Sequence, residues 1–135
     1  MKTVVVDSWA VMAWIKNEQP AADEVRRLME DAQAGTVQLL FSTINAGEVF
    51  YVLAKRHSRD KALWFKRRLP SLPLILIAPD TDTIWDAADL KSRYGMSYAD
   101  AFAAALALSR KAELLTGDPD FKPVENLRIS WLTRN

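Results

Sequence analysis

Short apolar runs recur along the chain and predict buried β-strands. The first run is β-branched throughout, which favours an extended strand in the interior of a sheet. Proline residues bracket the third run and mark its two ends. Five strands are predicted in this way: Thr3–Val6, Leu39–Phe41, Leu74–Ile77, Glu113–Leu115 and Arg128–Leu132.

Segments with helical periodicity and capping residues separate these strands. Small polar or acidic residues stand where each helix begins, and glycine or proline stands where most of them end. The first two predicted helices are Trp9–Lys16, after the Asp7-Ser8 cap, and Pro20–Ala34, before Gly35. The third runs from Ser42, Thr43 or Asn45 to Arg56, and the fourth is a basic helix that ends before Pro70. The fifth runs from Asp80 or Thr81 to Gly95, and the sixth is an alanine-rich helix from Ser97 through Ala107.

Strands that alternate with helices indicate a single α/β domain with right-handed crossovers. We expect this domain to cover residues 1–135 and to contain a mainly parallel central sheet of four to five strands flanked by helices. A chain of this length is large enough to bury a hydrophobic core.

Four acidic residues stand where a strand or turn passes into a helix: Asp7, Glu48, Asp100 and Asp118. An open α/β sheet gathers its ligands outside the carboxyl ends of its strands, so these side chains are expected to meet. Two unit charges about 4 Å apart repel by roughly 4 kcal/mol at an effective dielectric constant near 20. Protons or a divalent cation must therefore compensate such a cluster, and Mg²⁺ or Mn²⁺ suits oxygen ligands.

Helix capping is the alternative explanation for each acid taken singly. Asp7 has the position of an N-cap, and Asp118-Pro119 has the pattern of an N-cap followed by proline. The segments Asn45–Glu48 and Ser97–Asp100 both have the spacing of a capping box. Capping does not explain why several acids fall at the same predicted sheet edge, so the functional interpretation is favoured.

Composition narrows the possible chemistry. The chain has no cysteine and only one histidine, His57, which excludes disulfides, thiolate zinc sites, thiol nucleophiles and polyhistidine metal sites. A charge follows too soon after Met1 for a secretory signal peptide, and no apolar run approaches the length of a membrane span. We therefore expect a cytoplasmic protein that does not enter the membrane.

A strongly basic block lies within a chain whose net charge is only +1. Residues 55–68 contain seven lysines and arginines and a single acid, Asp60. The block is either a solvated helix face or a patch that binds the phosphates of a nucleic acid. The residues expected to contact an RNA backbone are Lys55, Arg56, Arg59, Lys66, Arg67 and Arg68. His57 is assigned to this basic surface rather than to catalysis.

The ordered motifs of the chain resemble those of the PIN domain family, and within it the VapC-type toxins. The resemblance extends from Val4-Val5-Val6-Asp7-Ser8 to Thr116-Gly117-Asp118-Pro119-Asp120-Phe121, with Glu48 and Ser97-Tyr98-Ala99-Asp100-Ala101 between them. Trp9 departs from the pattern, because the family more often has a small or polar residue there.

This resemblance implies that Asp7, Glu48, Asp100 and Asp118 bind Mg²⁺ or Mn²⁺ and cut RNA, leaving 5′-phosphate and 3′-hydroxyl ends. Ser8 and Thr116 match the accompanying hydroxyl positions of the family. Asp120 would supplement or replace Asp118 as a metal ligand. The resemblance also implies an antitoxin partner that covers the site, and a toxin homodimer. Met12 and Trp14, beside the expected cleft, are candidates for the partner's groove.

Three hypotheses follow, and a metal-dependent endoribonuclease toxin is the leading one. Carboxylate-held metal can supply the roles that a chain poor in other acids and bases lacks. The second hypothesis is a PIN-like module that binds RNA or protein around a structural metal without catalysis. The third, an acidic-pocket signalling domain of receiver type, requires a lysine near the acids beyond a late strand, where only Lys122 is available.

Overall fold

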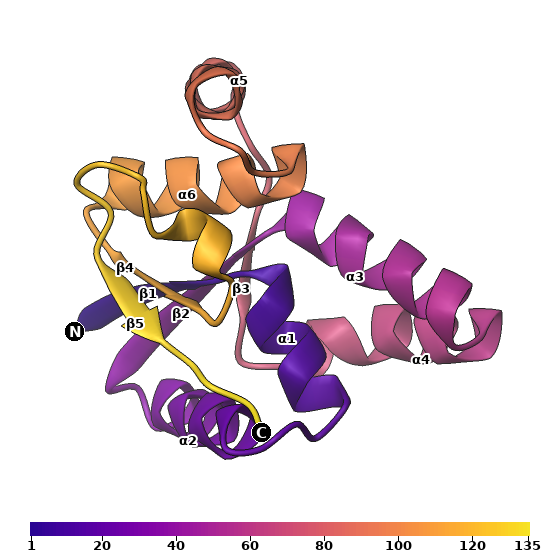
Figure 1. Ribbon diagram of the computed structural model, residues 1–135. Helices are drawn as coiled ribbons and strands as arrows, with labels where there is room; N and C mark the ends of the chain where they lie inside the picture. Colours follow the sequence, from indigo (N-terminus) through magenta and orange to yellow (C-terminus); the bar gives the residue numbers. More distant parts are fainter.

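A five-stranded, entirely parallel sheet organises the computed structural model, which describes residues 1–135. The order of its strands is β3-β2-β1-β4-β5, which places the first strand at the centre (Figure 1). Six helices flank the sheet, so the predicted fold class and parallel sheet are confirmed. The strands are β1 (Lys2–Val6), β2 (Val37–Ser42), β3 (Ile75–Ile77), β4 (Glu113–Thr116) and β5 (Ile129–Trp131).

The six helices agree with the predicted segments, with small shifts at their ends. Two short 3₁₀ turns, η1 (Leu69–Ser71) and η2 (Pro119–Phe121), complete the regular structure. No helix has the length and apolar character needed to cross a membrane. The helices are α1 (Ser8–Ile15), α2 (Ala21–Gln33), α3 (Thr43–Arg56), α4 (Arg59–Arg68), α5 (Thr81–Arg93) and α6 (Tyr98–Arg110).

The two faces of the sheet carry separate apolar clusters, because alternate residues of a strand point to opposite faces. Val4 and Val6 of β1 pack with residues of α1, α2, α3 and α4. Val5, between them, packs with residues of α5 and α6. Figure 1 shows α6 on one side of the sheet, with α5 outside it, and α2 on the other. The alanine-rich α6 is buried along most of its length, so small side chains let it lie close to the sheet.

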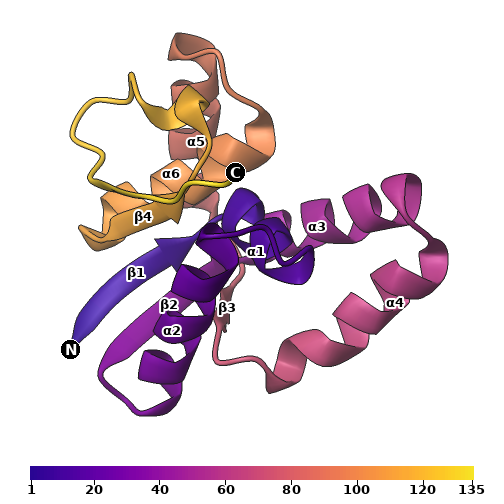
Figure 2. The same cartoon turned by 60° about the horizontal axis from the view of Figure 1, so that its bottom comes forward.

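Helices α3 and α4 form a hairpin that extends away from the sheet (Figure 2). Leu53 of α3 and Phe65 of α4 are buried in the same apolar cluster and join the two helices. The basic block defined above, residues 55–68, covers the tip of this hairpin and α4. The predicted basic helix is therefore confirmed, and it lies on a projecting part of the molecule.

Two local predictions differ from the structure. Helix α3 is capped by Ser42, whose hydroxyl accepts a hydrogen bond from the backbone N–H of Ile44 at 3.2 Å. Asn45 therefore lies inside the helix, and the capping-box interpretation of Asn45–Glu48 is wrong. The sequence predicts that Gly95 ends α5, but the helix ends at Arg93 and Tyr94 is already extended. Tyr94 packs against the cluster around α5 and α6, which draws the chain away from the helix.

Candidate metal-binding acidic cleft

The parallel pairing of β1 and β4 brings the first and the last candidate acids together. Val6 pairs with Leu115, so Asp7 and Asp118 both follow neighbouring strands at the same end of the sheet. Glu48 and Asp100 lie near the N-terminal ends of α3 and α6, two helices that contact each other. The four acids predicted from sequence therefore meet at one edge of the sheet.

Three of these acids line a cleft of about 250 Å³: Glu48, Asp100 and Asp118. Asp120, from the η2 turn, joins them, because carboxylate oxygens of Asp100, Asp118 and Asp120 all lie within 4.8 Å of one another. Asp7 is fully buried beside this group. A set of carboxylate oxygens at this spacing matches the ligands that Mg²⁺ and Mn²⁺ prefer.

Burial dominates the electrostatics of Asp7. The pKa of its carboxyl is raised to about 8, chiefly by loss of solvent and to a smaller extent by the nearby charges of Asp100 and Asp118. Two hydrogen bonds act in the opposite direction, from the Thr116 hydroxyl and from the backbone N–H of Ala10, the latter at 2.9 Å. The second bond confirms Asp7 as the N-cap of α1, so this residue both caps a helix and belongs to the acidic group.

Asp100 has the second perturbed carboxyl of the cluster. Its pKa is raised to about 7, first by partial burial and then by the charges of Asp118, Glu48 and Asp120, while the Ser97 hydroxyl lowers it. Burial and neighbouring like charges both disfavour the ionised form of a carboxyl group. Strongly shifted groups in a cleft are also candidates for a functional site.

A chain of hydrogen bonds connects Asp118 to Asp7 through Thr116. The backbone N–H of Asp118 donates to the Thr116 hydroxyl oxygen at 3.0 Å, and that hydroxyl donates to Asp7 Oδ2. Asp118 also caps the η2 turn, since its Oδ1 accepts from the N–H of Asp120 at 2.9 Å. Thr116 is thus a supporting residue that orients Asp7, and capping and clustering coexist at Asp118.

Replacing Thr116 with valine should destabilise the protein by about 1–3 kcal/mol, because a buried carboxylate and a backbone N–H both lose their partner. Thr116→Ser is the matched control, since it keeps the hydroxyl and should retain most of the stability. Urea unfolding of the three proteins measures the effect. Equal stability of the valine and serine variants would show that the hydroxyl does not hold Asp7.

Asn45 lies in α3 and is hydrogen-bonded to residues at the starts of α1 and α6. The sequence suggested it only as a helix cap. The Ser8 hydroxyl donates to the Asn45 carbonyl at 3.3 Å, and Asn45 Nδ2 donates to the Ala99 carbonyl at 3.1 Å. Asn45 is fully buried, and its Oδ1 has no partner. Ser8 and Ala99 directly adjoin Asp7 and Asp100, so Asn45 sets the spacing of α1, α3 and α6. An asparagine inside a predicted helix was the only available signal.

Trp9 forms one wall of the cleft and packs against the turn that carries Asp118. A Cβ atom placed on Gly117 would lie only 2.3 Å from the Trp9 ring, closer than real side chains approach. Gly117 is therefore required by the indole and not by its own backbone angle, since its φ is not left-handed. The unusual tryptophan is accommodated by a glycine on the facing loop.

The cleft also contains positive charge, which comes from three separate elements. Its lining includes Lys16 after α1, Arg56 at the end of α3 and Arg134 after β5. Arg56 is the one member of the predicted RNA-binding set that lies here. Lys66 lines a separate apolar pocket between α3 and α4. The remaining members are exposed on the hairpin: Lys55, Arg59, Arg67 and Arg68.

The residues considered for partner binding or for catalysis also lie partly inside and partly outside the acidic cleft. Met12 lines the acidic cleft, whereas Trp14 is half-buried against the core. His57 lies on the exposed hairpin, in a pocket with Lys16 and Lys61, and does not line the acidic cleft.

The all-parallel sheet and the carboxylate group beyond its central strands together define an α/β domain with an acidic cleft. The sequence profile of the PIN domain matches residues 4–127 of this chain. The chain belongs to the PIN domain family. This assignment excludes the receiver-type hypothesis, and no curated protein matches the sequence significantly.

Several solved structures similar to this chain are of toxins or toxin–antitoxin complexes. DNA-bound VapBC from Salmonella typhimurium has a TM-score of 0.72 at 15% identity and covers 96% of this chain and 98% of its own. VapBC2 from Rickettsia felis, bound to a promoter fragment, has 0.71 at 17%, with coverage of 95% and 97%. Mycobacterium tuberculosis VapC20, a sarcin-ricin loop cleaving toxin, has 0.71 at 18%, with coverage of 88% and 92%. At such identities the likeness establishes the fold.

Proposed function

We propose that this protein is a metal-dependent endoribonuclease and the toxin of a toxin–antitoxin pair. The observation that carries the proposal is the group formed by Asp100, Asp118 and Asp120 beside the buried Asp7, with Glu48 lining the same cleft. PIN family membership supports nuclease activity, and the VapC structures among its neighbours support the toxin assignment.

The donor set fits Mg²⁺ or Mn²⁺ as the resident cation. Every candidate ligand is a carboxylate oxygen, and the pKa values of Asp7 and Asp100 are raised first by burial and then by neighbouring carboxylates, both of which a bound cation would offset. When bound, such a cation activates water and stabilises the charge on the phosphoryl oxygens. The ligands assigned are Asp7, Glu48, Asp100, Asp118 and Asp120.

The protein's own residues then have distinct tasks. Asp7 is held rigidly by its helix cap and by Thr116, so it serves as the central ligand. Glu48 lines the same cleft and either binds metal or orients the attacking water. Ser8 supports the arrangement through its bond to the Asn45 carbonyl.

The partners proposed are an RNA substrate, a cognate antitoxin and a second copy of the toxin in a homodimer, all in the cytoplasm. Neighbouring structures were solved as VapBC assemblies, which supports the antitoxin. The exposed basic block on the α3–α4 hairpin remains a prediction for the RNA backbone, with Arg56 linking that block to the cleft.

Millimolar Mn²⁺ or Mg²⁺ should raise the melting temperature of the purified protein, because a ligand bound only by the native state stabilises that state. At a concentration of about 100 times the Kd the gain is roughly 2.7 kcal/mol. Asp118→Asn should reduce this gain strongly, whereas Asp82→Asn, an acid on α5, serves as the control. No thermal shift and no binding heat with either metal would contradict the metal site.

Cleavage of a labelled RNA by the same samples separates the two remaining hypotheses. The nuclease proposal expects products that require Mg²⁺ or Mn²⁺ and disappear with EDTA. Binding of RNA without cleavage under any divalent metal would instead favour the PIN-like binding module.

A further inference from the structure

The basic residues that line the acidic cleft cannot serve as ligands of a metal cation. Lys16 and Arg134 line the same cavity as Asp100 and Asp118. Cationic side chains next to metal ligands repel the metal and compete with it for the carboxylates. We therefore expect an anion to bind at the positive end of the cleft, which is the part lined by Lys16 and Arg134.

In the structure both basic side chains form ion pairs with the carboxylate of Glu18. Arg134 Nη1 lies 3.2 Å from Glu18 Oε1, and Lys16 Nζ lies 3.8 Å from Glu18 Oε2. About half of the Arg134 side chain remains exposed, at 49%. Ion pairs with this much exposure are weak because water screens them. A phosphate group has the charge and the oxygen geometry to replace the Glu18 carboxylate on a guanidinium.

The backbone on both sides of Arg134 is anchored, although its side chain is accessible. The backbone N–H of Ala21 donates to the Thr133 carbonyl at 3.0 Å, and that of Asn135 donates to the Gln19 carbonyl at 2.9 Å. These bonds attach the chain after β5 to the connection between α1 and α2. The guanidinium also lies over the Trp9 ring, 5.2 Å from its centroid.

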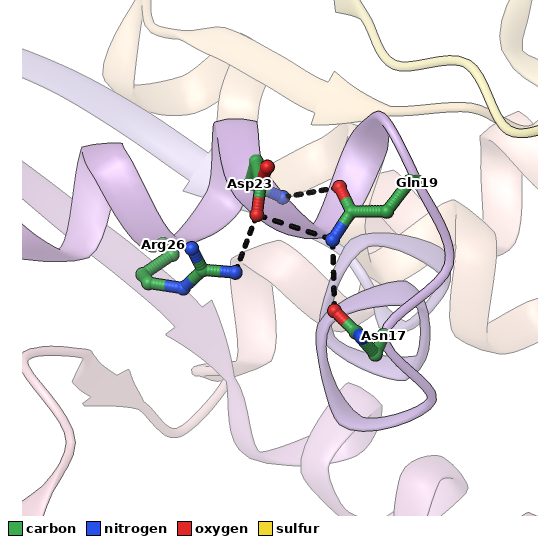
Figure 3. A network of polar contacts seen from close by, with 4 residues as sticks. All are labelled: Asn17, Gln19, Asp23 and Arg26. Atoms are coloured by element: carbon green, nitrogen blue, oxygen red, sulfur yellow. Dashed lines mark hydrogen bonds and ion pairs between the residues drawn. The ribbon is translucent and has the colours of Figure 1, made fainter.

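The connection that receives this segment is itself ordered by a side-chain network (Figure 3). Gln19 Nε2 donates to Asn17 Oδ1 at 2.8 Å and to Asp23 Oδ1 at 3.1 Å, and Arg26 donates to the same Asp23 oxygen. The network fixes the loop from which Glu18 extends. Glu18 and Arg134 are therefore placed by two rigid attachments, and only their side chains are free to exchange partners.

We infer that Arg134 and Lys16 form a phosphate subsite at the positive end of the acidic cleft, with Glu18 occupying it until an RNA phosphate takes its place. The inference rests on the proposed ribonuclease function. A phosphate next to the scissile one would bind this pair, while the scissile phosphate lies at the carboxylates. The opposed charges of the cleft would then set the direction in which the RNA strand crosses it.

The test measures binding of a single-stranded RNA oligonucleotide by fluorescence anisotropy at several salt concentrations. Asp100→Asn is present throughout to prevent cleavage. In this background Arg134→Gln should weaken binding about tenfold and reduce the log–log salt slope by about 0.7, the value for one lost phosphate contact on a single strand. Glu18→Gln should strengthen binding several-fold, because the competing carboxylate is gone.

Arg93→Gln is the matched control, because Arg93 is a half-exposed arginine paired with Asp89 on α5, outside the cleft. It should leave affinity and salt slope unchanged. In the cleavage-competent protein, Arg134→Gln should raise KM and leave kcat nearly unchanged. Neither cleft variant removes a metal ligand, so calorimetry should show that both still bind the metal, and Arg134→Gln, which removes a repelling charge, should bind it no more weakly than the unmodified protein.

Two outcomes would overturn the subsite. If Arg134→Gln lowers the melting temperature but neither the affinity nor the salt slope, Arg134 only anchors the end of the chain. If Glu18→Gln does not strengthen RNA binding, Glu18 does not compete with phosphate, and this variant remains informative even if Arg134→Gln folds poorly. Failure of the unmodified protein to bind or cut any RNA would instead reject the proposed function.

Discussion

Asp100→Asn should reduce metal-dependent RNA cleavage by about 10²–10³-fold, the order seen when one group that stabilises transition-state charge is removed. Burial raises the pKa of Asp100 most, and the charges of Asp118, Glu48 and Asp120 raise it further, which shows that all three acids lie near it. Substitution with asparagine keeps the side-chain shape and removes the charge. Steady-state cleavage of a defined RNA under Mn²⁺ measures the loss.

Three further variants show whether the loss of cleavage is specific to the acidic cleft. Asp118→Asn should be more damaging than Asp120→Asn, because Asp118 is partly buried and oriented by its bond to the Asp120 N–H, whereas Asp120 is exposed. Asp86→Asn on α5 should retain full activity. Undiminished cleavage by Asp100→Asn, in a folded protein, would place the active site elsewhere.

The metal-free protein should lose stability as the pH rises from about 4 to about 8. Between the ordinary pKa of Asp7, 3.8, and its folded value of about 8, the native state binds a proton that the unfolded state has released. Stability therefore falls with rising pH through this window and is highest below it. A shift of this size corresponds to a loss on the order of 5 kcal/mol, at about 1.36 kcal/mol per pH unit. Asp100, with its pKa raised to about 7, contributes in the same direction.

Urea unfolding in EDTA between pH 4 and pH 9 measures this dependence. Asp7→Asn should flatten most of it and should exceed the original protein in stability at pH 9, since asparagine retains an oxygen for the Ala10 N–H and carries no charge. Adding Mn²⁺ at pH 8 should restore the stability of the unmodified protein. A free energy of unfolding that is constant or rises over this range would contradict a buried, cation-free Asp7.

Local chemistry was sufficient to predict most of the secondary structure. The β-branched run before Asp7, the proline residues around β3 and the Asp118-Pro119 pair each act over a few residues, so their effects can be read without knowing the fold. The wrongly predicted start of α3 illustrates the limit. Ser42 and Asn45 both suited the start of α3, and only the tertiary contact of Asn45 with Ala99 places it inside the helix.

Which residues belong to the site could not be predicted in full, because it depends on distances between residues that are far apart in the sequence. The sequence left Asp118 and Asp120 as alternatives, whereas the η2 turn brings both to Asp100. Sequence also gave no indication of Arg134, because its partner Glu18 is 116 positions away and the two meet only after β5 and the α1–α2 connection are joined. A long-range ion pair leaves no periodic signal in the chain.

The contact between Trp9 and Gly117 restricts the order in which positions 9 and 117 can be substituted. While the indole is present, even alanine at position 117 would collide with the ring. Once Trp9 has become small, that collision is gone and side chains become sterically acceptable opposite it. A mutational path that replaces both residues must therefore change position 9 first. The same substitution on the Asp118 loop is harmful on one background and acceptable on the other, which is epistasis of purely steric origin.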